Sequence, residues 1–283
     1  MRSIDVHVHP MNEAYVQASM PFMPAAQRMF KGKFAARPDQ QIAEDFRRDD
    51  ALAIPIAWDA EHGAAGGVYA NEALAALTRD YPDVFLPGWA MVDPWRGRKG
   101  LEDIEHAIKN LGLMGVKYQP PVQGFAPNDR QFYPLYEQIE SLGVPALFHT
   151  GQTGIGAGLP GGRGIKLRLS DPMLVDDVAA DFPGLTIILA HPSVPWAASS
   201  ISIATHKANV FIDLSGWSPK YFPPELVRAA NSLLQDKVLF GTDYPLLTPQ
   251  RWLSDFEALD IKPQVRPKIL KDNAVKLLGL GDS

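Results

Sequence analysis

The chain contains no cysteine, which excludes disulfide bonds and thiolate metal sites. Any bound metal must therefore be held by His, Asp, Glu or Lys side chains. No apolar run approaches the roughly 20 residues of a membrane-spanning helix, so we expect no membrane association. Lys and Arg form no cluster and the net charge is −5, which argues against nucleic acid as a partner. Because β-rich sequence begins at residue 3, we expect no signal peptide and a cytoplasmic protein.

Short apolar runs recur at even spacing along the 283 residues, a length that suits one α/β barrel. Eight of these runs have the pattern typical of buried parallel strands. They are residues 3–9, 52–58, 84–92, 114–119, 145–149, 185–191, 210–214 and 237–243. Amphipathic segments alternate with them: 40–50, 71–81, 101–111, 129–142, 172–182, 196–208, 224–235, 249–259 and a last one at 267–278. This alternation predicts an α/β fold, a (β/α)8 TIM barrel that forms a single domain over residues 1–283. The alternative is an open doubly wound sheet, which normally needs fewer strands.

Two long connections interrupt the alternation. Residues 10–38, rich in Met, Phe, Pro and Ala, follow the first strand, and the glycine-rich residues 150–170 follow the fifth. Both are expected at the C-terminal rim of the barrel, where the active sites of such barrels form. The apolar stretch 20–34 predicts a lid or a subunit contact. The glycine-rich stretch predicts a segment that approaches a ligand closely.

The first strand carries the most informative motif. Residues 3–9 alternate, so that Asp5, His7 and His9 share one face. Two imidazoles spaced in this way lie side by side, close enough to hold one cation, and imidazole is a common zinc ligand. A histidine taken alone is more often a core or surface residue, so the interpretation depends on partners elsewhere in the chain.

Other predicted strands also end in polar side chains. These are Lys117, His149, His191 and Asp243. Taken singly, each has a structural explanation, such as a hydrogen-bonded core histidine, a rim charge or a turn cap. A closed barrel would bring all of them to one end, and buried ionisable groups cost several kcal/mol unless they are paired or metal-bound. Together with the first strand, the set predicts a metal site.

Five motifs carry a resemblance to a known family. They are Asp5-x-His7-x-His9-Pro10, Gly115-Val116-Lys117-x-x-Pro120, Phe148-His149-Thr150, Ala190-His191-Pro192 and Gly241-Thr242-Asp243-Tyr244-Pro245. In this order, over nearly the whole chain, they resemble the amidohydrolase superfamily. More narrowly, they resemble its amidohydrolase-related branch, which includes aminocarboxymuconate semialdehyde decarboxylase, γ-resorcylate decarboxylase and lactone hydrolases of lignin breakdown.

The resemblance implies a ligand set and a catalytic histidine. His7, His9, His149 and Asp243 would bind one divalent ion, zinc or alternatively manganese, and such a donor set suits either metal. His191 would take or deliver a proton beside it, and Asp243 would share that catalytic role. Asp5 would either orient a ring nitrogen of a ligand histidine or serve the structure alone.

Lys117 has two interpretations under this resemblance. In binuclear members of the superfamily a lysine of the fourth strand becomes carbamylated and bridges two metals. In the decarboxylase-like branch the site is mononuclear, and a residue in this region contacts the substrate or supports a ligand. The overall match favours the second interpretation.

The expected substrate is a small aromatic or unsaturated carboxylic acid or acyl compound, because aromatic residues stand next to several strand ends. The predicted substrate-binding residues are Lys117, Tyr118, Gln152, Arg163, Trp217 and Tyr244. Arg163 would hold a carboxylate or phosphate, with an ordinary solvated rim position as the alternative.

A metal-dependent hydrolase is the first functional prediction. The Gly-Gln-Thr-Gly loop and residues 215–221 resemble relatives that hydrolyse a β-ketoacyl-CoA thioester in aromatic-compound degradation, and Arg163, Lys166, Arg168 and Lys220 would suit a CoA phosphate. The alternative is a metal-dependent nonoxidative decarboxylase, a carboxy-lyase of an aromatic or enoic acid. A non-catalytic metal-binding barrel is the third hypothesis. Barrels of this branch are often homodimers, and that expectation rests on analogy alone.

Overall fold

Eight parallel strands form the centre of the molecule. The computed structural model describes residues 2–19, 23–30, 35–63 and 67–281. The strands are β1 (Ser3–Val8), β2 (Ala51–Pro55), β5 (Trp89–Met91), β6 (Gly115–Tyr118), β7 (Ala146–His149), β8 (Ile187–Ala190), β9 (Val210–Asp213) and β10 (Val238–Leu239). Strands β5 to β10 pair in sequence order, and β1 pairs with β2.

Backbone contacts at two junctions close this sheet on itself. A bridge between Ile56 and Trp89 joins the end of β2 to β5. On the other side, the amide of Val6 donates to the carbonyl of Phe240 over 3.0 Å, and Val8 bridges Tyr244. The eight strands therefore form a closed barrel, and the predicted (β/α)8 architecture is confirmed.

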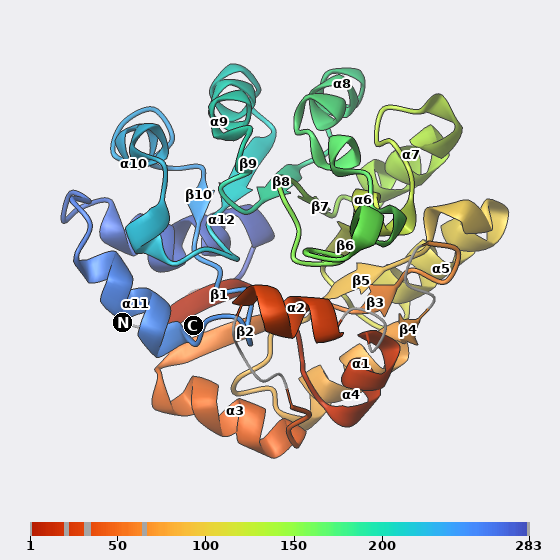
Figure 1. The fold of residues 1–283 in the computed structure, drawn as a ribbon, viewed down its shortest axis with the longest axis horizontal. Coiled ribbons are helices and arrows are strands. Elements are labelled where there is room, and N and C mark those ends of the chain that lie inside the picture. The colour runs from red at the N-terminus through yellow and green to blue at the C-terminus, as the bar shows by residue number, and fades with distance from the viewer. Residues whose placement is uncertain (1, 20–22, 31–34, 64–66, 282–283) are drawn as a thin grey trace.

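Helices surround the strands, as Figure 1 shows. The outer helices are α3 (Asp39–Arg48), α4 (Asn71–Asp80), α5 (Arg98–Lys109), α7 (Tyr133–Ser141), α8 (Met173–Asp181), α9 (Ala197–His206), α10 (Pro224–Ala230) and α11 (Pro249–Glu257). Shorter helices are α1 (Glu13–Ser19), α2 (Met23–Phe30), α6 (Pro120–Gln123) and α12 (Asn273–Leu278). Within the described residues, every helix is too short or too polar to cross a bilayer.

The alternation of side chains along each strand decides what faces the barrel interior. On β6, Val116 and Tyr118 belong to the buried layer between strands and helices, where Tyr118 stacks on Phe148. Lys117 lies between them in sequence, and its side chain therefore points the opposite way, into the barrel. The same alternation turns the strand-end histidines toward a common axis.

Four local features differ from the predicted elements. The strand expected at 84–92 is regular only over β5, because Pro87 lacks a backbone donor and Gly88 follows it. The helix expected at 267–278 begins with a π-helical turn at Lys268–Asp272. The first insertion contains α1 and α2, and a short hairpin, β3 (Trp58–Asp59) with β4 (Val68–Tyr69), was not predicted. Residues 20–22 and 31–34 of the expected lid lie outside the described residues.

Candidate active site

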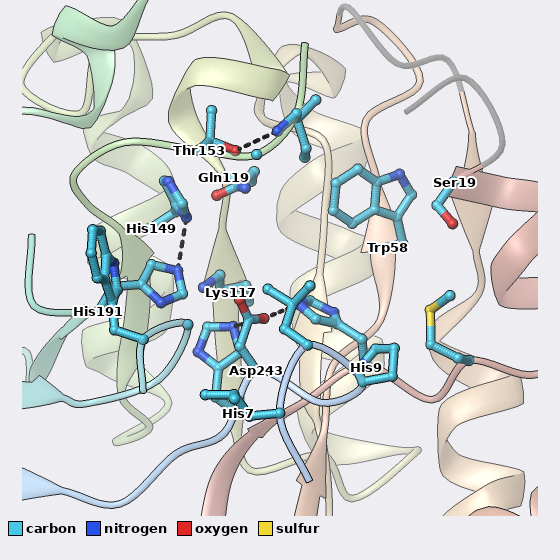
Figure 2. A pocket seen from close by; sticks show the side chains of 18 of the residues that line it. His7, His9, Ser19, Trp58, Lys117, Gln119, His149, Thr153, His191 and Asp243 are labelled. Carbon is cyan, nitrogen blue, oxygen red and sulfur yellow. Dashed lines mark hydrogen bonds and ion pairs between the residues drawn. The ribbon is translucent and has the colours of Figure 1, made fainter. Parts of the chain in front are cut away.

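A cavity of about 440 Å³ opens at the carboxyl ends of the barrel strands. Its polar lining includes His7, His9, Lys117, His149, His191 and Asp243, the residues singled out by their positions at strand ends. Figure 2 shows these side chains converging from different strands. Both insertions also contribute to the wall, because α1 supplies Tyr15 and the glycine-rich connection supplies Gln152.

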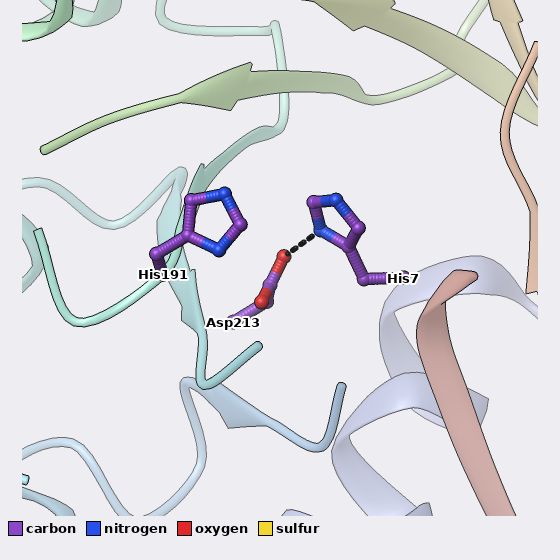
Figure 3. Close-up of side chains that lie close together, drawn as sticks. All are labelled: His7, His191 and Asp213. Atoms are coloured by element: carbon purple, nitrogen blue, oxygen red, sulfur yellow. Dashed lines mark hydrogen bonds and ion pairs between the residues drawn. The ribbon is translucent and has the colours of Figure 1, made fainter. Parts of the chain in front are cut away.

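His7 is held by a carboxylate from β9. Its Nδ1 lies 2.9 Å from Oδ2 of Asp213 (Figure 3), and both residues are buried. Burial, together with the positive charge of Lys117, lowers the pKa of His7 to about 3. The ring is therefore neutral, its Nδ1–H donates to Asp213, and its Nε2 keeps a lone pair that faces Oδ1 of Asp243 at 3.6 Å.

His9 faces the same carboxylate. Its Nε2 lies 2.9 Å from Oδ1 of Asp243, and its Nδ1 lies 2.6 Å from the hydroxyl of Tyr15. The Tyr15 ring packs edge-on against Trp58, which fixes the hydroxyl in place. Helix α1 of the first insertion therefore positions one of the candidate ligands.

His149 and His191 form a hydrogen-bonded pair. Nδ1 of His191 lies 3.1 Å from the carbonyl of Ser215, an acceptor that requires a hydrogen on that nitrogen. Nε2 of the neutral His191 ring then accepts from Nδ1 of His149 over 3.0 Å. Nε2 of His149 is left with a lone pair, and it is buried without a hydrogen-bond partner among the described residues. Burial, with the neighbouring His191, keeps the pKa of His149 well below its usual range.

The backbone at two of these residues adopts the left-handed region that disfavours most side chains. His191 has φ 71 and Asp243 has φ 61. Such conformations concentrate at functional sites, where the surrounding structure holds them. Burial would raise the pKa of Asp243, but the hydrogen bond from His9 and the other nearby histidines keep it well below its usual range.

Asp5 supports this arrangement through the backbone. Its carboxylate accepts from the amide of His7 at 3.1 Å and from the amide and hydroxyl of Thr242 at 2.9 and 2.5 Å. Asp5 therefore fixes the segment that carries Asp243, and none of its hydrogen bonds reaches a ring nitrogen. Burial raises the pKa of Asp5 to about 7 despite these bonds.

Asp213 and Ser215 belong to the site but were not predicted from the sequence. The Asp213 carboxylate also accepts from the amide of Ser215 at 2.7 Å, and the Ser215 hydroxyl lies 3.0 Å from Nδ1 of His7 and 2.9 Å from Nδ1 of His191. Burial would raise the pKa of Asp213, but His7 lowers it well below the usual range. The available signal was the carboxylate at the end of the strand expected at 210–214, which matches the pattern of the other strand ends.

The predicted substrate-binding residues divide into two groups. Lys117, Gln152 and Trp217 line the cavity. Tyr118 is instead buried in the aromatic layer behind β6, and Tyr244 packs on Phe46 with its hydroxyl accepting from Arg37. Arg163 is exposed in the glycine-rich connection and is absent from the described cavity lining. Tyr118, Arg163 and Tyr244 are therefore corrected: the structure does not place them where a ligand in this cavity would lie.

The donor set fits a metal ion. Nitrogen atoms of His7 and His9 and an oxygen of Asp243 lie within 4.8 Å of one another. Nδ1 of His7 is held by Asp213 and Nδ1 of His9 by the Tyr15 hydroxyl, so both Nε2 atoms face Oδ1 of Asp243, and a bound ion would replace the hydrogen bond between His9 and that carboxylate. A second compact group joins His7, His191 and Asp213, but its atoms are already engaged with one another and with Ser215. His149 belongs to neither group and offers its unpartnered Nε2 to the same cavity.

Comparisons with known proteins support the fold and identify a family. A sequence-family model described as amidohydrolase matches residues 4–280. A 2-amino-3-carboxymuconate-6-semialdehyde decarboxylase of Dictyostelium discoideum is 23% identical over an alignment of 305 positions, which covers 90% of this chain and 82% of that protein. An uncharacterized TIM-barrel protein of Bordetella bronchiseptica matches with a TM-score of 0.84 at 25% identity, over 99% of both chains. A dihydroxybenzoic acid decarboxylase of a Polaromonas species, solved with manganese and 2-nitroresorcinol, matches with a TM-score of 0.75 at 18% identity, over 100% of this chain and 98% of that one.

Proposed function

The chain belongs to the amidohydrolase family, and from this membership we propose that it is a metal-dependent, nonoxidative decarboxylase of an aromatic or enoic acid. One observation carries the proposal: His7, His9 and Asp243 converge within the cavity, which is also lined by His149, whose Nε2 has no partner among the described residues, and by Lys117. The relative from Dictyostelium and the Polaromonas enzyme are both named decarboxylases, which supports this reaction class over acyl transfer to water.

We propose that His7, His9, His149 and Asp243 hold one divalent ion, zinc or manganese. Imidazole nitrogens and a carboxylate oxygen suit both ions, and the Polaromonas neighbour contains manganese. When bound, the ion supplies a Lewis acid that polarises an oxygen of the substrate. Because the Nδ1 atoms of His7 and His9 are already hydrogen-bonded, the protein holds the Nε2 atoms ready for coordination.

The remaining chemistry is one proton transfer. When the bond to the carboxyl group breaks, carbon dioxide leaves and the electron pair stays on the carbon, which then takes a proton. Because His191 is neutral and Asp243 is ionised in the ligand-free protein, the proton is drawn from solvent water; we assign its transfer to the carbon to these two residues, which both line the cavity. The Ser215 carbonyl fixes the His191 ring. The Trp58 and Trp217 side chains line the cavity and would shield the flat, apolar part of the acid from water.

Hydrolysis of an acyl-CoA, the first prediction from the sequence, has less support. The basic residues expected to hold a CoA phosphate, Arg163, Lys166, Arg168 and Lys220, are absent from the described cavity lining. Lys166 and Arg168 border a second cavity of about 400 Å³ instead. The comparisons also favour the decarboxylase.

A substrate panel tests the reaction class. Manganese-loaded protein is incubated in deuterium oxide with hydroxybenzoic, aminobenzoic and dienoic acids, and carbon dioxide and the product are quantified. We expect stoichiometric carbon dioxide and one deuterium on the carbon that carried the carboxyl group. Release of an acid from an ester or thioester panel, carrying oxygen from the solvent and without carbon dioxide, would instead establish a hydrolase.

Asp213→Asn is expected to weaken metal binding about 10- to 100-fold, since the single amide oxygen cannot accept from both the Ser215 amide and Nδ1–H of His7. Competition with a chelator measures the dissociation constant. Asp236→Asn, an exchange at an exposed position, provides the control. An unchanged dissociation constant for Asp213→Asn would show that His7 needs no such support.

Gly216→Ala is expected to reduce carbon dioxide release far more than it reduces stability. Gly216 has φ +76, and a Cβ there would lie 2.7 Å from Nδ1 of His191 and 3.2 Å from Oδ2 of Asp243. Gly112→Ala is the matched control, because Gly112 has φ +72 with nothing within 4 Å of its Cβ position. Both variants carry a backbone cost of about 1–2 kcal/mol, visible in thermal unfolding. Equal activities in the two variants would contradict the prediction.

A further inference from the structure

The second cavity, of about 400 Å³, lies outside the active site and takes no part in the chemistry proposed above. Its described lining comes from the loop after β3, the turn before α5, the segment from α6 to Phe132, and the end of the glycine-rich connection. None of these lining residues belongs to the described lining of the active-site cavity. A cavity of about 150 Å³ holds benzene, so this one has room for a ligand larger than a single ring.

Lys166 and Arg168 bring two positive charges to this cavity. Both side chains are exposed, and within the described residues neither forms an ion pair or a side-chain hydrogen bond. The carboxylate of Asp129 also lines the cavity, but it is engaged by the backbone and side-chain amides of Gln131 at 3.1 and 2.6 Å. The cavity therefore carries an excess of positive charge, which attracts an anionic ligand.

Trp95 gives the cavity a flat face in a fixed orientation. Its Nε1 donates to the carbonyl of Gln123 at 2.7 Å, and its ring packs at right angles on Phe132 with 5.0 Å between the centroids. The side chain nevertheless remains 44% exposed. An indole that is held in this way offers a face on which another ring can stack. Together with the two cations, it favours a ligand that combines a planar ring with a negative charge.

The glycine-rich connection contributes to both cavities. Its residues 152–155 line the active-site cavity, and its residues 164, 166, 168 and 169 line the second one. Between these two stretches, Gly156, Gly158, Gly161 and Gly162 have positive φ. Because glycine has more conformational freedom to lose than other residues, a ligand that holds one end of this connection also restrains the other end.

The segment that follows β6 forms a second link between the cavities. Gln119 lines the active-site cavity and Gln123 lines the other. The buried Gln123 side chain accepts from the backbone amide of Gln119 at 2.8 Å and donates to the carbonyls of Asp59 and Val92 at 2.9 and 3.2 Å. The floor of the second cavity is therefore hydrogen-bonded to the wall of the active site.

We propose that the second cavity binds a planar ring that carries a phosphate or carboxylate group, and that this ligand restrains the wall of the active site through the glycine-rich connection. Lys166 and Arg168 bind the anionic group, and Trp95 stacks on the ring. The ligand is thus a regulator that binds beside the catalytic centre, and its site does not depend on which reaction that centre performs.

Matched naphthalene probes test the binding site. Calorimetry on manganese-loaded protein compares 2-naphthyl phosphate with 2-naphthol, which lacks the charge, and with inorganic phosphate, which lacks the ring. We expect 2-naphthyl phosphate to bind about 10- to 100-fold more tightly than 2-naphthol, the range for hydrogen bonds to charged groups. Its advantage over inorganic phosphate should be about 5- to 100-fold, the range for stacking on an aromatic side chain. Comparison with 2-naphthoate shows whether phosphate or carboxylate is the preferred anion.

Variants assign each preference to its residues. Lys166→Gln/Arg168→Gln should lose the preference over 2-naphthol, whereas Arg98→Gln/Lys109→Gln, which removes two exposed cations of α5, should keep it. Trp95→Leu should lose the preference over inorganic phosphate, and Trp95→Phe, which retains a ring, should keep most of it. Thermal unfolding confirms that each variant is folded.

Hydrogen exchange tests the link to the active site. Saturating 2-naphthyl phosphate should slow amide exchange in residues 164–169 and also in residues 152–155. The affinity should be unchanged after a chelator removes the metal, because none of the proposed metal ligands lines the second cavity.

Four results would overturn the proposal. They are an absence of binding, an affinity that is insensitive to Lys166→Gln/Arg168→Gln, binding that requires the metal, and unchanged exchange in residues 152–155. Binding that requires the metal would place the probe in the active-site cavity instead.

Discussion

Asp243→Asn is expected to release the bound metal and to lower carbon dioxide release by about 10³-fold or more. The carboxylate is the one negative donor of the proposed ligand set, and its Oδ1 is the point on which Nε2 of His7 and His9 converge. Loss of a Lewis acid removes several kcal/mol of transition-state stabilisation, and about 1.4 kcal/mol corresponds to a factor of ten. Metal per chain after dialysis and initial rates on the best acid of the panel measure the two effects.

Asparagine is the informative replacement because residue 243 adopts a left-handed backbone conformation, which asparagine tolerates better than alanine. A loss of metal in this variant therefore reports on the ligand rather than on the backbone. Asp80→Asn, at the exposed end of α4, is the control for loss of a surface charge. If the Asp243→Asn protein bound one equivalent of metal with the affinity of wild type, the ligand set proposed here would be wrong.

The strand ends could be predicted because a barrel imposes its own geometry. Alternating patterns place His7 and Lys117 on inward faces, and closure brings parallel strands together at their carboxyl ends. Asp213 follows the same rule but was not predicted, since a single aspartate two residues before Ser215-Gly216 is equally typical of the start of a turn. The convergence of the six polar residues at the strand ends could thus be predicted, whereas the hydrogen bonds that hold their side chains in place could not.

The predictions that failed depended on information that periodicity does not carry. Tyr118 follows an inward-facing residue, and the alternation of β6 alone places it outside the barrel interior. Tyr244 is turned into the layer formed with Phe46. The position of Arg163 depends on the path of a connection with several positive-φ glycines, which no short-range pattern determines. Substrate contacts from loops are therefore the least predictable part of such a site.

His191→Asn is expected to lower carbon dioxide release by about 10²- to 10⁴-fold, the usual effect of removing a general acid or base, while the protein keeps its metal. Both ring nitrogens of His191 are engaged, Nδ1 with Ser215 and Nε2 with His149, so the residue positions a ligand and moves a proton without coordinating the ion itself. Asparagine also suits the positive φ of this position.

The paired measurements separate the two roles that lie side by side in this cavity. Asp243→Asn should lose metal and rate together, whereas His191→Asn should lose rate alone. Metal loss from His191→Asn as complete as from Asp243→Asn would instead favour the second compact donor group, in which His191 joins His7 and Asp213. In that event Asp213 would be a ligand, its hydrogen bond to His7 would be broken in the loaded enzyme, and Asp213→Asn would abolish metal binding rather than weaken it.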